Sequence, residues 1–503
     1  AAPRGSAQPS PAGGARRVAR NSLLPFVANL LGRGMALGLA AIMARTLGAE
    51  GTGAYAVAVN LWLYASIVAD FGLGTWLTRE VARAPTTARD VLCDTLGLRL
   101  ILSALALPVL ILAAVAAGYV QSGMADWRLV ATVTLLGVGL LPGAVSAAGS
   151  ALFNAHERMT FPAAVQLASA ALTTTGGAAV LLLGFDIVAL GWVSLLVNGA
   201  TAAIFTVASA RHFFPLGVAF HRRRQTALAR DALPLMLNSL LNNVFFRFDV
   251  QVLQSKGSAA VGYYANAYRV IDAAGAVPSS FVLALFPLLS RRAAAASATN
   301  TDGHGRAGAE GLARVYCLAL KLLMVVALPL ALMVTFAAVD LTRWAWGAAF
   351  LPDSAIALQI LIWFLPLSFF NGLTQYVLIA LGLQRRITIA FALAAGFNVA
   401  ANLVLIPLYG YVAAAAVTIA SEVVLLGPFL LALRERVPVA SAIRAALRPL
   451  PAALGLGLAL WAPAPWPRPA AILVGGVLFA SLLVVTGVFD RSERRVLMSL
   501  VKT

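Results

Sequence analysis

Five polar side chains follow one face of a helix within an otherwise apolar stretch of the sequence. Ser239, Asn243, Arg247, Gln251 and Gln254 are spaced by four, four, four and three residues, which places them in one line on an α-helix. Hydroxyls and amides can bond other polar groups, and arginine offers planar, bidentate donors that match phosphate oxygens. Hydrogen bonding between helices would explain part of such a stripe. Five positions in one line exceed what packing needs and favour a polar cavity.

A second cation lies in the first apolar stretch of the chain. Asn29 and Arg33 are one helical turn apart, and Arg33 falls near the middle of the stretch. A charge at the centre of a bilayer costs from about 3 to over 10 kcal/mol, so an unpaired one should face a cavity. The alternative is a buried pair between Arg33 and Asp272 or Glu422.

A third group of polar residues follows the stripe. Asn266, Arg269 and Asp272 are spaced by three residues, so Arg269 and Asp272 can also pair within their own helix. Asp249 is two residues from Arg247 and points to the opposite side, which predicts a salt bridge to a neighbouring helix. We expect Asp249, Asp272 and Glu422 to be candidates for binding a coupling ion.

Other reactive side chains are expected to have no role in a site. Arg99 and Lys321 lie within two turns of the predicted inner face, so we expect them to snorkel to the lipid headgroups. Cys93 and Cys317 are too few for a disulfide framework or a zinc site. The sequence predicts neither a metal centre nor a catalytic residue.

The composition requires a membrane around these residues. The 503 residues are 61% hydrophobic and 11% charged, more apolar surface than a soluble protein of this length could bury. The net charge of +18 would suit nucleic acid, but the charges lie in short loops between apolar stretches. We therefore predict no nucleic-acid partner.

Fourteen stretches are long and apolar enough to span a bilayer, each about 20 residues or more. They lie near 22–44, 55–77, 95–119, 128–152, 161–184, 187–209, 232–255, 260–289, 313–338, 354–382, 388–407, 410–433, 447–462 and 469–489. The fold class predicted from them is an all-α polytopic membrane protein.

The charges of the loops alternate along this map. With the N-terminus inside, 27 of the 37 lysines and arginines fall on the inner side, five in outer loops and five within spans. This is the pattern of the positive-inside rule. It predicts a multi-pass membrane protein with both termini in the cytoplasm.

An internal repeat divides the first twelve spans. At a constant offset of 209 residues, the sequence pairs Pro25 with Pro234, Asn29 with Asn238, Gly48 with Gly257, Gly53 with Gly262, and Tyr55 with Tyr264. Two halves that both begin inside predict two six-helix lobes, related as parallel repeats around a central pathway. The predicted order is a disordered basic tail (1–20), an N-lobe (21–210), a basic linker (211–231), a C-lobe (232–436), two extra spans (437–490) and a cytoplasmic tail (491–503).

Several segments resemble one known family. The segments ARTLGAEGTGAYAVAVNL (44–61), FRFDVQVL (246–253), VGYYANAYRVID (261–272) and NVAANLVLIPLYGYVAAAAVTIASE (398–422) are similar to parts of Wzx-type polysaccharide flippases. These belong to the multidrug/oligosaccharidyl-lipid/polysaccharide exporter superfamily. The resemblance covers most of residues 20–435. It implies two six-helix bundles around a central cavity that opens alternately to each side.

The resemblance also implies a function. We expect transport of a polyprenyl-diphosphate-linked sugar across the bacterial inner membrane for cell-surface polysaccharide synthesis. Membrane lipids, a polysaccharide polymerase and glycosyltransferases would be partners. Arg33, Arg247 and Arg269 would bind the diphosphate, and the amides of Asn29, Asn243, Asn266, Gln251 and Gln254 would bond sugar hydroxyls. A proton or sodium gradient is expected to reset the lobes, and no other cofactor is predicted.

Two other functions remain open at this stage. A drug exporter of the same superfamily would favour an acidic cavity, whereas five cations and four acids lie within these spans. A membrane glycosyltransferase or polymerase would need catalytic residues in a large outer loop. The longest outer loop, near 339–353, carries Asp340, Arg343 and Asp353.

Overall fold

Every regular element that the structure describes is helical. The computed structural model describes residues 11–122, 124, 126–297, 304–461, 468–490 and 493, and within these ranges no strand occurs. An apolar chain favours this outcome, because backbone polar groups in a bilayer must find hydrogen bonds within the protein. The prediction of an all-α polytopic protein is confirmed.

Helices lie at all fourteen predicted spans. Within the described ranges, nine stretches are long and apolar enough to cross a membrane. Two of these, Val27–Arg83 and Gln384–Leu433, contain sharp breaks at Gly48 and Gly410, so each corresponds to two predicted spans. Three predicted spans outside the nine coincide with α8, with α9 and α10 together, and with α17, of which Val474–Val485 is a shorter apolar stretch.

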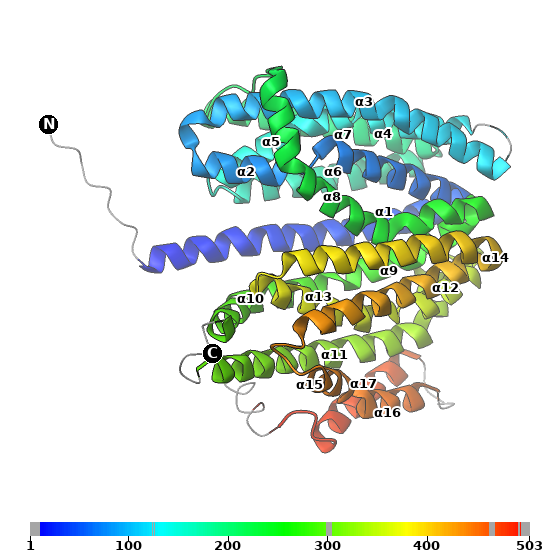
Figure 1. The fold of residues 1–503 in the computed structure, drawn as a ribbon. Coiled ribbons are helices and arrows are strands. Elements are labelled where there is room, and N and C mark those ends of the chain that lie inside the picture. The colour runs from blue at the N-terminus through cyan, green and yellow to red at the C-terminus, as the bar shows by residue number, and fades with distance from the viewer. Residues whose placement is uncertain are drawn as a thin grey trace. The chain divides into compact units, whose positions relative to one another are not determined.

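The chain forms two compact units, Ala1–Leu240 and Leu241–Thr503. The first unit is coloured blue to green in Figure 1. Its elements are α1 (Pro11–Asp70), α2 (Leu73–Arg83), η1 (Pro85–Thr87), α3 (Ala88–Ser122), α4 (Trp127–Val138), α5 (Leu140–Ala155), α6 (Thr160–Leu182), α7 (Ile187–His212) and the first part of α8 (Arg222–Leu253).

The second unit begins within α8 and holds the remaining helices. Its elements are η2 (Gln254–Lys256), α9 (Ser258–Ala274), α10 (Ala276–Ser297), α11 (His304–Ala345), η3 (Ala348–Phe350), α12 (Asp353–Leu361), α13 (Phe364–Ala380), α14 (Gln384–Leu433), α15 (Val439–Leu447), α16 (Leu450–Trp461) and α17 (Arg468–Val485). Figure 1 shows α15, α16 and α17 beside α11.

Two glycines that the internal repeat pairs have the same backbone role. Gly48 breaks α1 with φ 68°, and Gly257 separates η2 from α9 with φ 96°. Glycine suits both positions because it adopts positive φ without steric cost. The offset of 209 residues therefore relates two helix breaks in the structure.

The helices begin earlier than the predicted tail and linker boundaries. Residues 1–10 and, apart from Glu493, 491–503 lie outside the described residues, whereas 11–20 form the start of α1. The second half of the predicted linker 211–231 is already helical, because α8 begins at Arg222. The two units divide within this helix, after Leu240.

A second helix break positions the candidate site. Phe71 and Gly72 have φ values of 51° and 73°, so α1 ends at Asp70 and α2 begins at Leu73. A Cβ on Gly72 would lie 2.7 Å from Leu235 Cβ and 3.1 Å from the Met236 backbone nitrogen. The break thus lets α8 pack closely against this corner of the first unit.

An apolar core supports the same corner. Buried side chains of α2, α3, α5 and α8 form one cluster, which includes the fully buried Leu77, Leu92, Leu152 and Ala232. Close packing of this kind fixes the helix ends to one another. The polar residues that follow on α2, α3 and α5 are therefore held by a rigid base.

Candidate functional site

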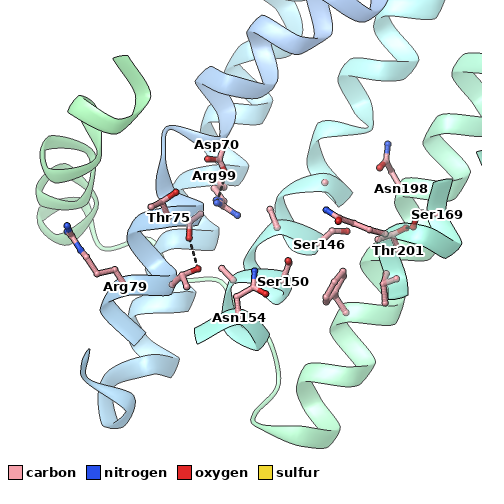
Figure 2. Close-up of a pocket in the computed structure, with 18 residues that line it drawn as sticks. Asp70, Thr75, Arg79, Arg99, Ser146, Ser150, Asn154, Ser169, Asn198 and Thr201 are labelled. Atoms are coloured by element: carbon pink, nitrogen blue, oxygen red, sulfur yellow. Dashed lines mark hydrogen bonds and ion pairs between the residues drawn. The ribbon is translucent and has the colours of Figure 1, made fainter. Parts of the chain in front are cut away.

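The first unit contains a polar cavity of about 850 Å³, within the range of roughly 300–1,000 Å³ typical of ligand sites. We call it the hydroxyl cavity. Its polar lining residues are Asp70, Thr75, Thr78, Arg79, Arg99, Ser146, Ser150, Asn154, Gln166, Ser169, Asn198 and Thr201. They come from the end of α1 and from α2, α3, α5, α6 and α7, as Figure 2 shows.

One row of these residues follows α5. Ser146, Ser150 and Asn154 are spaced by four residues, so they share a helix face. Figure 2 places this row between the Asp70–Arg99 pair and the residues Ser169, Asn198 and Thr201. Hydroxyl and amide groups are what a polyol ligand requires, because they both donate and accept hydrogen bonds.

Some of these groups are engaged and others are open to a ligand. The Ser169 and Thr201 hydroxyls lie 2.7 Å apart, and Thr78 donates to the Gly74 carbonyl at 2.9 Å. The side chains of Ser150 and Asn154 line the cavity and make no hydrogen bond to any described residue. The open donors and acceptors thus include those of α5.

An ion pair between a buried arginine and a half-exposed carboxylate lies on one side of the cavity. Arg99 Nη2 lies 2.5 Å from Asp70 Oδ1, and the two side chains are 1% and 44% exposed. A Cβ on Gly74 would lie 3.2 Å from Arg99 Nη2, so this glycine leaves the room that the guanidinium needs. The expectation that Arg99 snorkels is wrong, because its charge is buried against a carboxylate.

Several buried donors gather beyond this pair. Arg99 Nε and Nη1, Trp62 Nε1 and Ser103 Oγ have no hydrogen-bond partner among the described residues. All three side chains line a second cavity of about 230 Å³, which also includes Asp70 and Asn198. Buried donors without partners are rare in proteins, so this region is suited to water or to polar groups of a ligand.

The predicted cation of the first spans lies elsewhere in the first unit. Arg33 Nε donates to Asn29 Oδ1 at 2.9 Å, and both side chains are exposed. The two residues, which the sequence places one helical turn apart, are therefore in contact. Neither residue lines the hydroxyl cavity.

The predicted cations of the second unit also have partners. Arg247 Nη2 lies 2.7 Å from Asp272 Oδ2, and its guanidinium stacks 4.5 Å from the centre of the Tyr268 ring. Arg269 Nη1 donates to Asn266 Oδ1 at 2.7 Å. Arginine has five N–H donors, so the ion pair of Arg247 leaves further donors to bind an anion.

The residues of the polar stripe become less exposed from the start to the end of the stripe. Ser239 is exposed and Asn243, Arg247 and Gln251 are half-buried. Gln251 Nε2 is buried and has no hydrogen-bond partner within the described ranges. Gln254 is 3% exposed and lies in η2, since α8 ends at Leu253. The stripe on the helix itself therefore consists of four residues.

Two predicted carboxylates are buried in the second unit without a cation. Asp249 is 2% exposed, accepts a hydrogen bond from the Tyr264 hydroxyl, and lies 3.4 Å from the Thr418 hydroxyl. No lysine or arginine of the described chain forms an ion pair with it. The predicted salt bridge of Asp249 is therefore replaced by hydroxyl contacts.

Glu422 is the second of these carboxylates and is 1% exposed. Asn371 Nδ2 donates to its Oε2 at 2.5 Å and to its backbone carbonyl at 2.9 Å. Glu422 and Asn371 line a pocket of about 210 Å³ with Asn242, Ser368 and Gln375. An acid buried in a polar pocket of a membrane protein suggests ion or proton binding.

The sequence interpretation missed the hydroxyl cavity. The spacing of four between Ser146, Ser150 and Asn154 was visible, but serine commonly serves as a small packing residue between membrane helices. Arg99 and Asp70 are 29 residues apart, and the sequence alone does not show which cation meets which acid. The helix break at Phe71, which creates the corner, also lacks a sequence signal of its own.

Comparisons with known proteins relate most of the chain to one fold. The sequence model of a family described as polysaccharide biosynthesis protein matches residues 18–292. No curated protein sequence matches significantly. The solved structure of "Lipid II flippase MurJ, inward closed conformation" superposes with a TM-score of 0.72 and 13% identity, covering 93% of this chain and 99% of that one.

Two multidrug transporter structures share the fold. One is the inward-facing conformation of a MATE family transporter of the MOP superfamily, with a TM-score of 0.61, 16% identity, and coverage of 85% of this chain and 98% of that one. The other is the MATE multidrug transporter DinF-BH, with a TM-score of 0.61, 12% identity, and coverage of 86% and 98%.

Proposed function

Since the chain belongs to the family of polysaccharide biosynthesis proteins, we propose that it is a flippase for a polyprenyl-diphosphate-linked oligosaccharide. It is a transporter rather than an enzyme. It would move the sugar from the cytoplasmic to the outer leaflet of the bacterial inner membrane, with both termini in the cytoplasm. The observation that carries this proposal is the hydroxyl cavity of about 850 Å³.

The hydroxyl cavity is suited to a sugar headgroup. The open side chains of Ser150 and Asn154 can bond sugar hydroxyls, which lose their water when they enter the protein and need new partners. Asn154 lies one residue before the end of α5, and the following loop carries Arg158, a predicted cytoplasmic residue. Entry of the sugar from the cytoplasmic side is consistent with this position.

The predicted arginines would serve the diphosphate. Arg33, Arg247 and Arg269 would offer planar guanidinium groups whose N–H donors match the oxygens of a phosphate. The amides of Asn29, Asn243, Asn266, Gln251 and Gln254 would add hydrogen bonds along the path. The polyprenyl tail would stay in the bilayer, so only the headgroup needs a polar route.

A drug exporter is the alternative that the charges of the cavity disfavour. Asp70 is the one acid among the residues lining the hydroxyl cavity, all of which lie in the described chain. Its charge is balanced by Arg99 at 2.5 Å. A cationic drug would therefore find no net negative charge there, whereas an uncharged sugar requires none.

A transport assay with matched substrates tests the proposal. Proteoliposomes would be given a fluorescent polyprenyl-diphosphate oligosaccharide, the same polyprenyl diphosphate without sugar, and a cationic rhodamine dye. We expect Ser150→Val with Asn154→Leu to slow transport of the sugar-bearing lipid about tenfold, which corresponds to one or two lost hydrogen bonds. The bare diphosphate should be affected less, and Arg33→Ala, Arg247→Ala and Arg269→Ala should slow both lipids.

The control is Thr175→Val, which removes an exposed hydroxyl of α6 that bonds only to its own helix backbone and lies outside the cavity. It should transport normally. Transport of the dye in preference to both lipids would show a drug exporter. If the cavity variant slowed transport of both lipids equally, the hydroxyl cavity would not bind the sugar. If all three arginine variants transported normally, those arginines would not bind the diphosphate.

A further inference from the structure

A basic pocket lies outside the residues discussed so far, between α11 and α15 of the second unit. Its volume is about 340 Å³. Arg314 and Lys321 reach it from α11, and Arg444 and Arg448 reach it from α15 and the residue that follows. We call it the arginine pocket. The helices that form it pack directly against each other.

Helix periodicity explains why these cations converge. Ser441, Arg444, Ala445 and Arg448 follow spacings of three, one and three residues, so they share one face of α15. Ala445 is 3% exposed and lets that face approach α11 closely. The pocket is therefore a product of the fold rather than a chance gathering of surface charges.

Two of the four cations are already paired with acids. Lys321 Nζ lies 2.7 Å from Glu493 Oε1, and the two side chains are 6% and 12% exposed. The expectation that Lys321 snorkels is therefore wrong. Arg448 Nη1 lies 3.2 Å from Asp490 Oδ1. With these two cations paired, the net charge of the pocket lining comes from the remaining arginines.

Arg314 and Arg444 supply that remaining charge. Both are exposed, and neither forms an ion pair or side-chain hydrogen bond with any residue that the structure describes. The pocket lining thus has four cations and two acids. Two open guanidinium groups on facing helices can clamp a phosphate group from two sides.

The surface beside the pocket is apolar. Ile443 and Leu447 lie one turn apart on α15 and are 42% and 53% exposed, and Leu454 of α16 is 61% exposed. Exposed aliphatic side chains on a membrane helix face lipid tails. A ligand with a phosphate in the pocket would therefore place attached acyl chains along this surface, which a free phosphate ion has no means to use.

We propose that the arginine pocket binds the phosphodiester headgroup of an anionic membrane phospholipid. Basic pockets between membrane helices at the cytoplasmic side commonly hold such headgroups, and the loops near this pocket are predicted to be cytoplasmic. The bound lipid would join α15 and α16 to α11. The proposal concerns a structural lipid and does not depend on which substrate the protein transports.

Lipid binding to the full chain in detergent tests the proposal. Native mass spectrometry would measure affinity for dioctanoyl phosphatidylglycerol, dioctanoyl phosphatidylcholine and inorganic phosphate. We expect phosphatidylglycerol to bind about tenfold more tightly than phosphatidylcholine. The double variant Arg314→Gln/Arg444→Gln should lose that advantage, since both charge-assisted contacts to the phosphate are removed.

The matched control is Arg385→Gln/Arg434→Gln, which removes the same charge from exposed arginines near the two ends of α14. It should keep the preference for phosphatidylglycerol. Equal loss in this control would show a general charge effect and overturn the proposal. Competition by inorganic phosphate at the same concentration would show a free-anion site and would also overturn it.

A second variant that keeps both positive charges tests the proposal even if the double glutamine variant does not fold. Arg314→Lys/Arg444→Lys keeps both positive charges but lacks the planar pair of donors that each arginine offers. We expect its affinity for phosphatidylglycerol to fall about threefold while its affinity for phosphatidylcholine stays the same. An unchanged affinity for phosphatidylglycerol would contradict a guanidinium clamp.

Discussion

The Arg99–Asp70 pair is unequal in its exposure to solvent. Arg99 is 1% exposed and Asp70 is 44% exposed, although the two groups share one ion pair. A buried charge without its partner costs several kcal/mol, whereas a half-exposed carboxylate keeps much of its hydration. The stability of this corner should therefore depend more on Asp70 than on Arg99.

This difference in exposure predicts that substituting Asp70 destabilises the protein more than substituting Arg99. Asp70→Asn should lower the free energy of unfolding by about 3 kcal/mol, because it leaves Arg99 buried without an anion. Arg99→Met should lower it by about 1 kcal/mol, because an apolar chain of similar length replaces the cation. Denaturant titration in mixed micelles would measure both. Equal losses, or a larger loss for Arg99→Met, would contradict this account.

At the residue scale, the sequence predicted which residues are polar but not which residues they meet. The spacing of Asn29 and Arg33 placed both on one face of a helix, and the structure adds the hydrogen bond between them. The partners of Asp249 come from α9 and α14, and spacing along α8 carries no information about either. Pairings within a helix follow from periodicity, whereas pairings between helices require the fold.

At the scale of elements, the segment before α8 is held tightly against α3. The Ala219 backbone nitrogen donates to the Cys93 carbonyl at 3.1 Å, and His221 Nδ1 lies 2.7 Å from Asp94 Oδ1. A Cβ on Gly97 would lie 2.1 Å from the Ala219 carbonyl oxygen. Only glycine fits there, because the obstacle is backbone rather than a flexible side chain.

Gly97→Ala should therefore displace this segment. We expect the free energy of unfolding to fall by about 2 kcal/mol, the usual cost of an overpacked site. Cys93 should react with a maleimide several times faster, since Gly217 of the same segment lies beside its sulfur, where an added Cβ would be 3.0 Å away. Reaction at Cys317, in the second unit, serves as the internal reference and should not change.

Gly38→Ala is the matched control for this element. Nothing lies within 4 Å of the Cβ that it would add, and alanine favours a helix by about 1 kcal/mol over glycine. It should leave Cys93 labelling unchanged and stability equal or slightly higher. Faster labelling of Cys93 in both variants would show that close packing at Gly97 is not the cause.

The elements themselves were largely predictable from the sequence. The lengths of the apolar stretches and the alternation of positive charge between loops located the helices, because the thickness and apolar interior of the bilayer determine both. The repeat located the breaks at Gly48 and Gly257, where glycine carries positive φ. The break at Phe71 and Gly72 was not predicted, because it falls near the end of a predicted span and the repeat does not pair it with a second glycine.

At the scale of the whole molecule, transport requires a source of free energy. Outward movement of a diphosphate follows the inside-negative potential, which contributes about 2.3 kcal/mol per charge per 100 mV. That term acts on the substrate alone and does not return the protein to its starting state. Asp249 and Glu422, each at most 2% exposed and without an ion-pair partner in the described chain, are the candidates for an ion that does so.

We therefore expect transport to respond to a proton or sodium gradient through these two carboxylates. Flux of the sugar-bearing lipid in proteoliposomes should rise when one of the two gradients is imposed. Glu422→Gln and Asp249→Asn should abolish that rise, because an amide keeps the hydrogen bonds but neither releases a proton nor neutralises a cation. Glu435→Gln, at an acid that is 61% exposed, should keep the response. If flux is unchanged when both gradients are collapsed, neither carboxylate couples an ion, and the membrane potential and substrate gradient must suffice.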